Sequence, residues 1–132
     1  MKKVLCEIET VLLKPSVVRE DVATIGVIVR CEDTGFQGFR LIDPKGARVV
    51  VLDRFFPGYG VENIHQAIEW ANNDISYAFE RERQPGGKGA FANLIRPREN
   101  VVHYGAPRVA LCSDPATLLE SEYKNLVEKE II

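Results

Sequence analysis

The sequence predicts an α+β fold in which a small, mainly antiparallel sheet carries two principal helices. Residues 22–29 form an uncharged run rich in β-branched side chains, which is typical of a strand buried on both faces. Residues 61–83 carry apolar side chains at helical spacing along one face. Short, turn-rich connections between the expected strands favour antiparallel pairing. The predicted order of elements is β-β-β-β-α-β-β-α, with the helices packed on one face of the sheet.

The run of residues 22–29 continues to Cys31 and is the strand around which we expect the sheet to be built. Gly26 interrupts it, which predicts either a close approach by a neighbouring element or a bulge. A half-buried strand over residues 3–13 precedes it. After a turn at residues 32–35, a short strand over residues 39–42 follows it.

The remaining elements follow from turn and capping signals. Residues 48–52 (RVVVL) favour a fourth strand, although the same residues could begin a helix. Residues 84–89 end the long helix in a flexible break, a short helical turn follows at 91–94, and two short strands are predicted at 101–104 and 108–112. Asp114 can cap the last helix and Pro115 suits its first position, with the helix running to about residue 130.

Length and composition indicate one domain over residues 1–132, with 45% hydrophobic and 27% charged residues. The net charge of −2 argues against polyanion binding by bulk charge. Glu7 and Glu9 interrupt the apolar N-terminal run, so we expect neither export nor a membrane span. Three widely spaced cysteines argue against a disulfide framework and favour a reducing, cytoplasmic location.

The sequence predicts no catalytic residue, no metal site and no cofactor. His65 and Glu69 lie four residues apart on the long helix, but such pairs are common on solvated helix faces. The glycine-rich residues 86–89 lack the Lys-Ser/Thr ending of a phosphate loop. A hydrolase assembled only in three dimensions stays an alternative, which would need Glu20, His103 or Cys31 in a deep pocket with strongly shifted pKa values.

The segment from residue 81 to residue 108, here called the basic segment, carries six positive and two negative side chains, a net of +4 in a chain of −2. Arginine combined with His103 and Tyr104 suits a phosphate backbone or an acidic protein surface. The alternative is that the arginines pair with the chain's own acids, such as those of the last helix. The candidate binding residues are Arg81, Arg83, Lys88, Arg96, Arg98, His103 and Arg108.

A second candidate surface is an aromatic pair on the long helix. Trp70 and Tyr77 lie seven residues apart and point away from the Ile64–Ile68–Ile75 stripe. Exposed aromatic pairs are typical anchors of protein interfaces. In the alternative, another segment such as Phe55-Phe56 folds over them.

A family resemblance runs through about residues 5 to 128. Glu20 followed by Ile25-Gly26-Val27, then Phe91-x-x-Leu94-x-x-Pro97-Arg98 and Ser113-Asp114-Pro115, resembles a bacterial family, domain of unknown function 3037. Thr24 stands where members usually carry asparagine. The resemblance implies no activity and no cofactor. Members are often encoded beside small kinases that resemble the HipA toxins, which implies a partner protein.

We therefore expect a non-enzymatic, cytoplasmic interaction or regulatory module that binds another protein. The partner would be a HipA-like kinase, or a nucleic-acid-processing complex if the chain is of phage or defence origin. Direct binding of nucleic acid or nucleotide phosphate through the basic segment is the alternative, and its affinity would fall steeply with salt.

Overall fold

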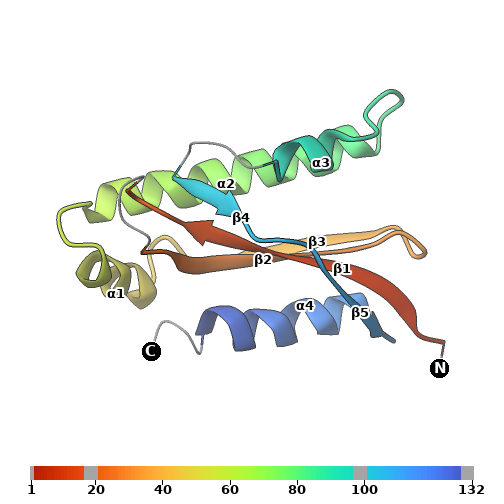
Figure 1. Cartoon of the computed structure of the whole chain (residues 1–132), viewed down its shortest axis with the longest axis horizontal. Helices are drawn as coiled ribbons and strands as arrows, with labels where there is room; N and C mark the ends of the chain where they lie inside the picture. Colours follow the sequence, from red (N-terminus) through yellow and green to blue (C-terminus); the bar gives the residue numbers. More distant parts are fainter. Residues whose placement is uncertain (1, 17–20, 97–100, 129–132) are drawn as a thin grey trace.

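The computed structural model of the chain describes residues 2–16, 21–96 and 101–128. Within these ranges, five antiparallel strands form one sheet: β1 (Val4–Leu13), β2 (Ala23–Cys31), β3 (Phe36–Leu41), β4 (Val102–Tyr104) and β5 (Arg108–Cys112). The strand order is β3-β2-β1-β4, and β5 continues the β4 edge by pairing with the N-terminal half of β1 (Figure 1). The predicted α+β class is confirmed.

The buried strand predicted from the sequence is β2, which lies between β1 and β3. Ile25, Val27 and Ile28 have no exposed surface, so side chains on both faces of this strand are covered. β1, however, pairs with β2, β4 and β5. The sheet is therefore built on β1 as much as on β2.

Gly26 meets both expectations for a glycine inside a strand. A Cβ atom at this position would lie 2.3 Å from Cδ2 of Leu41 on β3. The pairing register of β1 with β2 also shifts between Val11 and Leu12, directly opposite Gly26. Only a residue without a side chain allows β3 to approach this closely.

The long helix is confirmed as α2 (Val61–Glu82), and its inner face is buried at Ile64, Ala67, Ile68, Ala71, Ile75, Ala78 and Phe79. Among the described residues, neither this helix nor any other is long and apolar enough to cross a bilayer. The predicted flexible break is held by hydrogen bonds, because the Gly87 N–H donates to the Gln84 carbonyl at 3.0 Å. A short helix, α3 (Ala90–Leu94), follows as predicted.

The predicted fourth strand is wrong, because this segment forms a helix, α1 (Ala47–Phe55). Consecutive valines favour a strand on propensity alone. Val49 and Leu52 are buried, three residues apart, while Val50 and Val51 are exposed. This helical burial pattern packs α1 against α2, and tertiary packing overrides the local propensity.

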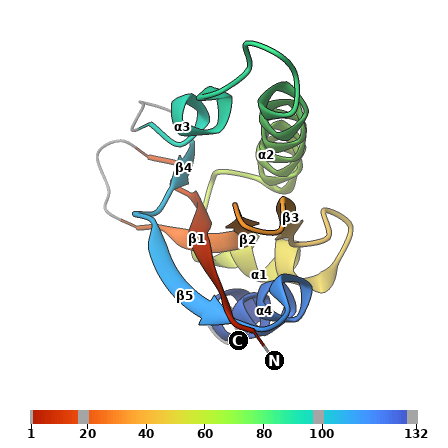
Figure 2. The ribbon, with the colours of Figure 1, turned by 90° about the vertical axis from the view of Figure 1, so that its right-hand side faces the viewer.

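The prediction that the helices share one face of the sheet is also wrong. Helix α4 (Pro115–Tyr123) and a π-helical turn (Lys124–Glu128) cover the face opposite α2 (Figure 2). The physical reason is that β2 is apolar on both faces, and each face needs a cover. The predicted cap is confirmed, since the Asp114 carboxylate accepts a hydrogen bond from the Ala116 N–H at 3.2 Å.

Candidate functional site

The outer face of α2 carries a stripe of exposed side chains, here called the outer stripe: Trp70, Asp74, Tyr77 and Arg81. Their spacings of four, three and four residues place them on one side of the helix. Trp70 is 48% exposed and Tyr77 is 64% exposed, so both aromatic side chains point away from the sheet as expected. The alternative that residues 55–56 cover this pair is wrong.

A groove of about 390 Å³ runs between the C-terminal half of α2 and α3. It is lined by Asp74, Tyr77, Ala78, Arg81, Ala90, Asn93 and Leu94. The groove therefore joins Tyr77 of the predicted aromatic surface to Arg81 of the basic segment, two surfaces that the sequence left separate.

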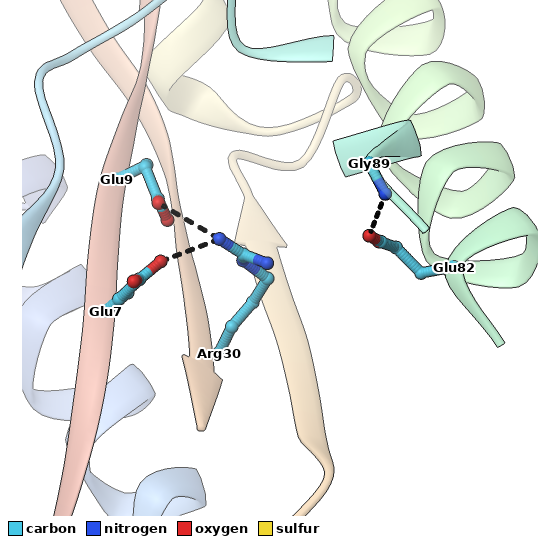
Figure 3. Close-up of polar contacts among 5 residues, drawn as sticks. All are labelled: Glu7, Glu9, Arg30, Glu82 and Gly89. Atoms are coloured by element: carbon cyan, nitrogen blue, oxygen red, sulfur yellow. Dashed lines mark hydrogen bonds and ion pairs between the residues drawn. The ribbon is translucent and has the colours of Figure 1, made fainter. Parts of the chain in front are cut away.

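Two backbone interactions hold α3 beside α2. The Gly89 N–H donates to the Glu82 carboxylate at 2.9 Å (Figure 3). Gly87 packs so tightly that a Cβ atom there would lie 1.6 Å from the Arg81 carbonyl oxygen. These contacts close the connection between the two helices, so the groove is already formed in the isolated chain.

Phe91 anchors α3 in the core of the protein. Its side chain is fully buried, and its ring stacks on Phe79 of α2 with the centroids 5.6 Å apart. The guanidinium carbon of Arg30, on β2, lies 3.7 Å from the centre of the Phe91 ring. This cation–π contact connects the buried side of α3 to strand β2 of the sheet.

Arg30 also belongs to a charged cluster that the sequence analysis did not identify (Figure 3). Its Nη2 donates to Glu7 at 2.7 Å and lies 3.7 Å from Oε1 of Glu9. Glu7 pairs with Arg30 in the β1–β2 register, and Glu9 projects from the same face two residues later. The signal in the sequence was two glutamates at alternate positions of an apolar strand.

Glu9 is fully buried, and neither of its carboxylate oxygens accepts a hydrogen bond from the described residues. Burial raises the pKa of Glu9 to about 7, and the neighbouring Arg30 only partly offsets this rise. A carboxyl group with such a pKa has the acidity of a general acid or base at neutral pH. Since Glu9 has no exposed surface, we interpret it as a titratable structural group beneath α3.

The charged residues of the basic segment are distributed over several elements. Arg83 donates to the Gln37 side chain at 3.0 Å, and Arg108 donates to Glu122 of α4 at 3.1 Å. The second contact is the pairing with the last helix that the alternative interpretation expects. The other exposed positive side chains of the basic segment on or beside α2 and α3 are Arg81, Lys88 and Arg96, whereas His103 on β4 is half-buried and Arg98 lies outside the described residues.

The residues named for a hydrolase are not brought together where the structure describes them. Continuing the β1–β2 register by one residue puts Cys31 opposite Cys6, whereas His103 pairs with Leu12. These two positions on β1 are separated by six residues, or about 20 Å along the strand. Glu20 lies outside the described residues. Within the described ranges, no group of three or more His, Cys, Asp or Glu side chains is arranged to hold a metal ion.

Comparison with known proteins identifies one family. The model of the family described as "Protein of unknown function (DUF3037)" matches residues 9–127, which is most of the chain. This match confirms the resemblance stated from the sequence motifs. No curated protein and no solved structure gives a significant match.

Proposed function

The chain belongs to the family of proteins of unknown function DUF3037, and we propose that it is a non-enzymatic module that binds another protein along α2 and α3. The observation that carries this proposal is the exposure of Trp70 and Tyr77 beside a groove that is already formed. Large aromatic side chains next to a fixed groove are suited to anchor a partner, because binding would remove most of their surface from water.

The spacing of the aromatic side chains fits a helical segment of the partner. Trp70 and Tyr77 are seven residues apart on one face, a separation of about 10 Å along the helix axis. A partner helix with apolar side chains at heptad spacing would meet both rings. This is the helix-in-groove mode of recognition, with α3 as the second wall of the groove.

Asp74 and Arg81 both line the groove, but the further cations flank α3, so the partner segment is proposed to be acidic near its contact with α3. Arg81 lines the groove, and exposed Lys88 and Arg96 lie in the segments that flank α3. Within the described part of the chain, no ion pair engages these three side chains. Carboxylates of the partner would form charge-assisted hydrogen bonds with them.

Direct binding of nucleic acid or nucleotide phosphate is the second candidate, supported by Arg81 beside Tyr77 in the groove and by exposed Lys88 and Arg96 in the segments that flank α3. The pairing of Arg108 with Glu122 of α4 removes one cation from the basic segment. Such binding would weaken steeply as salt rises, whereas docking through Trp70 and Tyr77 would not.

The class of partner follows from the family resemblance. We propose that the module acts in the cytoplasm, as three cysteines without a disulfide framework suggest, and modulates a small kinase similar to the HipA toxins. A nucleic-acid-processing complex of phage or defence origin is the other partner class.

Affinity capture from lysate of the source cell, with and without nuclease, tests the proposal. Immobilised parent protein is compared with a Trp70→Ala/Tyr77→Ala variant and with a matched control, Val109→Ala/Leu111→Ala. The control removes two exposed apolar side chains, each 65% exposed, from β5, away from α2. We expect a stoichiometric protein that survives nuclease and is retained by the control but lost by the α2 variant.

The other outcomes are equally informative. Equal capture by the parent and the α2 variant would contradict docking on the outer stripe. Recovery of nucleic acid, or of proteins that nuclease releases, would favour the second candidate. An Arg81→Ala/Arg96→Ala variant would then lose binding to every nucleic-acid sequence and show a smaller salt dependence.

A further inference from the structure

The three cysteines, isolated in the sequence, converge at one end of the sheet. Sγ of Cys6 on β1 lies 3.3 Å from Sγ of Cys112 on β5. In the antiparallel register, Val4 pairs with Cys112 and Cys6 pairs with Ala110. Cys6 and Cys112 are therefore diagonal neighbours on the same face of the sheet.

Cys31 completes the cluster from the other side of β1. Continuing the β1–β2 register places it opposite Cys6. All three residues are free thiols, and their access to solvent differs. Cys6 and Cys31 are buried, whereas Cys112 is partly exposed on the last strand.

We propose that Cys6 and Cys112 form a reversible disulfide by exchange with a small-molecule disulfide of the glutathione class. The sulfur atoms already face each other across two paired strands, so bond formation requires an approach of little more than 1 Å toward the S–S length of about 2.0 Å. Cys112 is the entry point, because it alone of the three offers surface to a reagent.

The exchange has two steps. The Cys112 thiolate attacks one sulfur of glutathione disulfide, which forms a mixed disulfide and releases one glutathione. The Cys6 thiolate then attacks Sγ of Cys112 and displaces the second glutathione. The two protein thiols lose two electrons to the glutathione disulfide, and their two protons pass to the glutathione thiolates.

The environment of Cys6 sets the order of these steps. Burial, together with hydrogen bonds to the Cys112 and Cys31 side chains, raises the pKa of Cys6 to about 12. Cys6 is therefore a poor first nucleophile, and it reacts only once a mixed disulfide stands beside it.

The disulfide would fasten the last strand and helix to the sheet. β5 ends at Cys112, and Asp114, the cap of α4, follows two residues later. A bond from Cys112 to Cys6 closes a covalent loop through nearly the whole chain, which restricts the unfolded state. Oxidation should thus stabilise the attachment of β5 and α4.

The test exposes the purified full chain to glutathione disulfide, blocks remaining thiols by alkylation, and measures intact mass and non-reduced peptides. We expect a mass loss of about 2 Da before alkylation, from the two hydrogens removed. A peptide joining Cys6 to Cys112 should appear, with one alkylated cysteine at position 31. The melting temperature should rise by several degrees and return after dithiothreitol.

Matched variants assign the bond. Cys31→Ser should keep the mass loss and the thermal shift, whereas Cys112→Ser and Cys6→Ala should lose both. Since Cys6 is buried, its variant could misfold. The peptide map of the parent protein therefore identifies the bonded cysteines independently of the variants. A bond between any other pair, a reaction that stops at the glutathione adduct, or no reaction would overturn the proposal.

Discussion

The two helical layers of this protein cover the sheet in different ways. On one side, the acidic side chains of α4 and its π-helical turn are paired within the chain: Arg40 with Glu120, Arg48 with Glu128 at 3.7 Å, and Arg108 with Glu122 at 3.1 Å. Arg40 also lies over the Tyr123 ring at 4.1 Å. On the other side, α2 and α3 leave Trp70, Tyr77 and Arg81 facing outward.

The difference between the layers lies in their outer surfaces, because both bury an apolar face against the sheet. A helix whose charged side chains already form ion pairs within the chain has few charges available to bind a partner. A helix with exposed aromatic side chains beside a groove still has apolar surface available for binding. We therefore interpret α4 as a structural cover and the α2–α3 layer as the binding surface.

The largest expected effect in the α2–α3 layer comes from Phe91→Ala. Removing this fully buried ring takes away its contacts with Phe79 and Arg30 and leaves a cavity, so we expect a loss of about 3–5 kcal/mol in the free energy of unfolding. Urea denaturation measures it. Phe55→Ala, which removes a ring that is 52% exposed, is the matched control and should cost well under half as much. Equal costs would show that α3 is not anchored through Phe91.

The second effect is a pH dependence of stability that arises from buried Glu9 on β1. Folded protein holds the Glu9 proton up to about pH 7, whereas the unfolded chain releases it near the ordinary value of 4.5. The free energy of unfolding should therefore fall as pH rises from 4.5 to 7, by roughly 3 kcal/mol at about 1.4 kcal/mol per pKa unit.

Urea denaturation of Glu9→Gln across this pH range checks the assignment. The variant should lose the pH-dependent fall, because the amide does not titrate. Glu7→Gln, on the same strand but half-exposed, should retain it. A Glu9→Gln protein with the parent's pH profile would show that another group is responsible.

A smaller effect is expected from the ion pairs of the α4 layer. Arg108→Ala should cost about 1 kcal/mol or less, since the Arg108 side chain is 52% exposed and such pairs are screened by solvent. A double-mutant cycle with Glu122→Ala, followed by thermal denaturation at low and high salt, measures the coupling. A coupling of several kcal/mol would mean that α4 depends on its charges more than on its apolar face.

The smallest effect on stability is expected on the outer stripe. Tyr77→Ala should change the free energy of unfolding by about 0.5 kcal/mol or less, because its side chain is 64% exposed, and Trp70→Ala, at 48% exposure, by less than about 1 kcal/mol. Denaturation curves that overlay the parent's would show that any lost binding is local. A loss above about 2 kcal/mol in the free energy of unfolding would instead show that these rings stabilise the fold.

The sequence was a good guide where one pattern decides one element. The α2 stripe, the Asp114 cap and the strand around Gly26 were each predictable from neighbouring residues. It was misleading at residues 48–52, where three valines favour a strand but packing against α2 selects a helix.

Features that depend on strand register could not be predicted from the sequence alone. Glu7 and Glu9 were interpreted only as an interruption of an apolar run, although their partner Arg30 lies 23 and 21 positions away in the chain. The three cysteines looked isolated for the same reason, and pairing of β1 with both β2 and β5 brings them together. The groove likewise required α3 to fold back on α2.

The most direct test of the central claim is site-specific photocrosslinking inside the source cell. A photoreactive phenylalanine derivative replaces Tyr77 on α2 or, as the control, exposed Ser121 on α4. We predict a nuclease-resistant protein adduct of defined mass from position 77 and none from position 121. An adduct from position 121 alone, or equal adducts from both, would contradict the assignment of α2 and α3 as the binding surface.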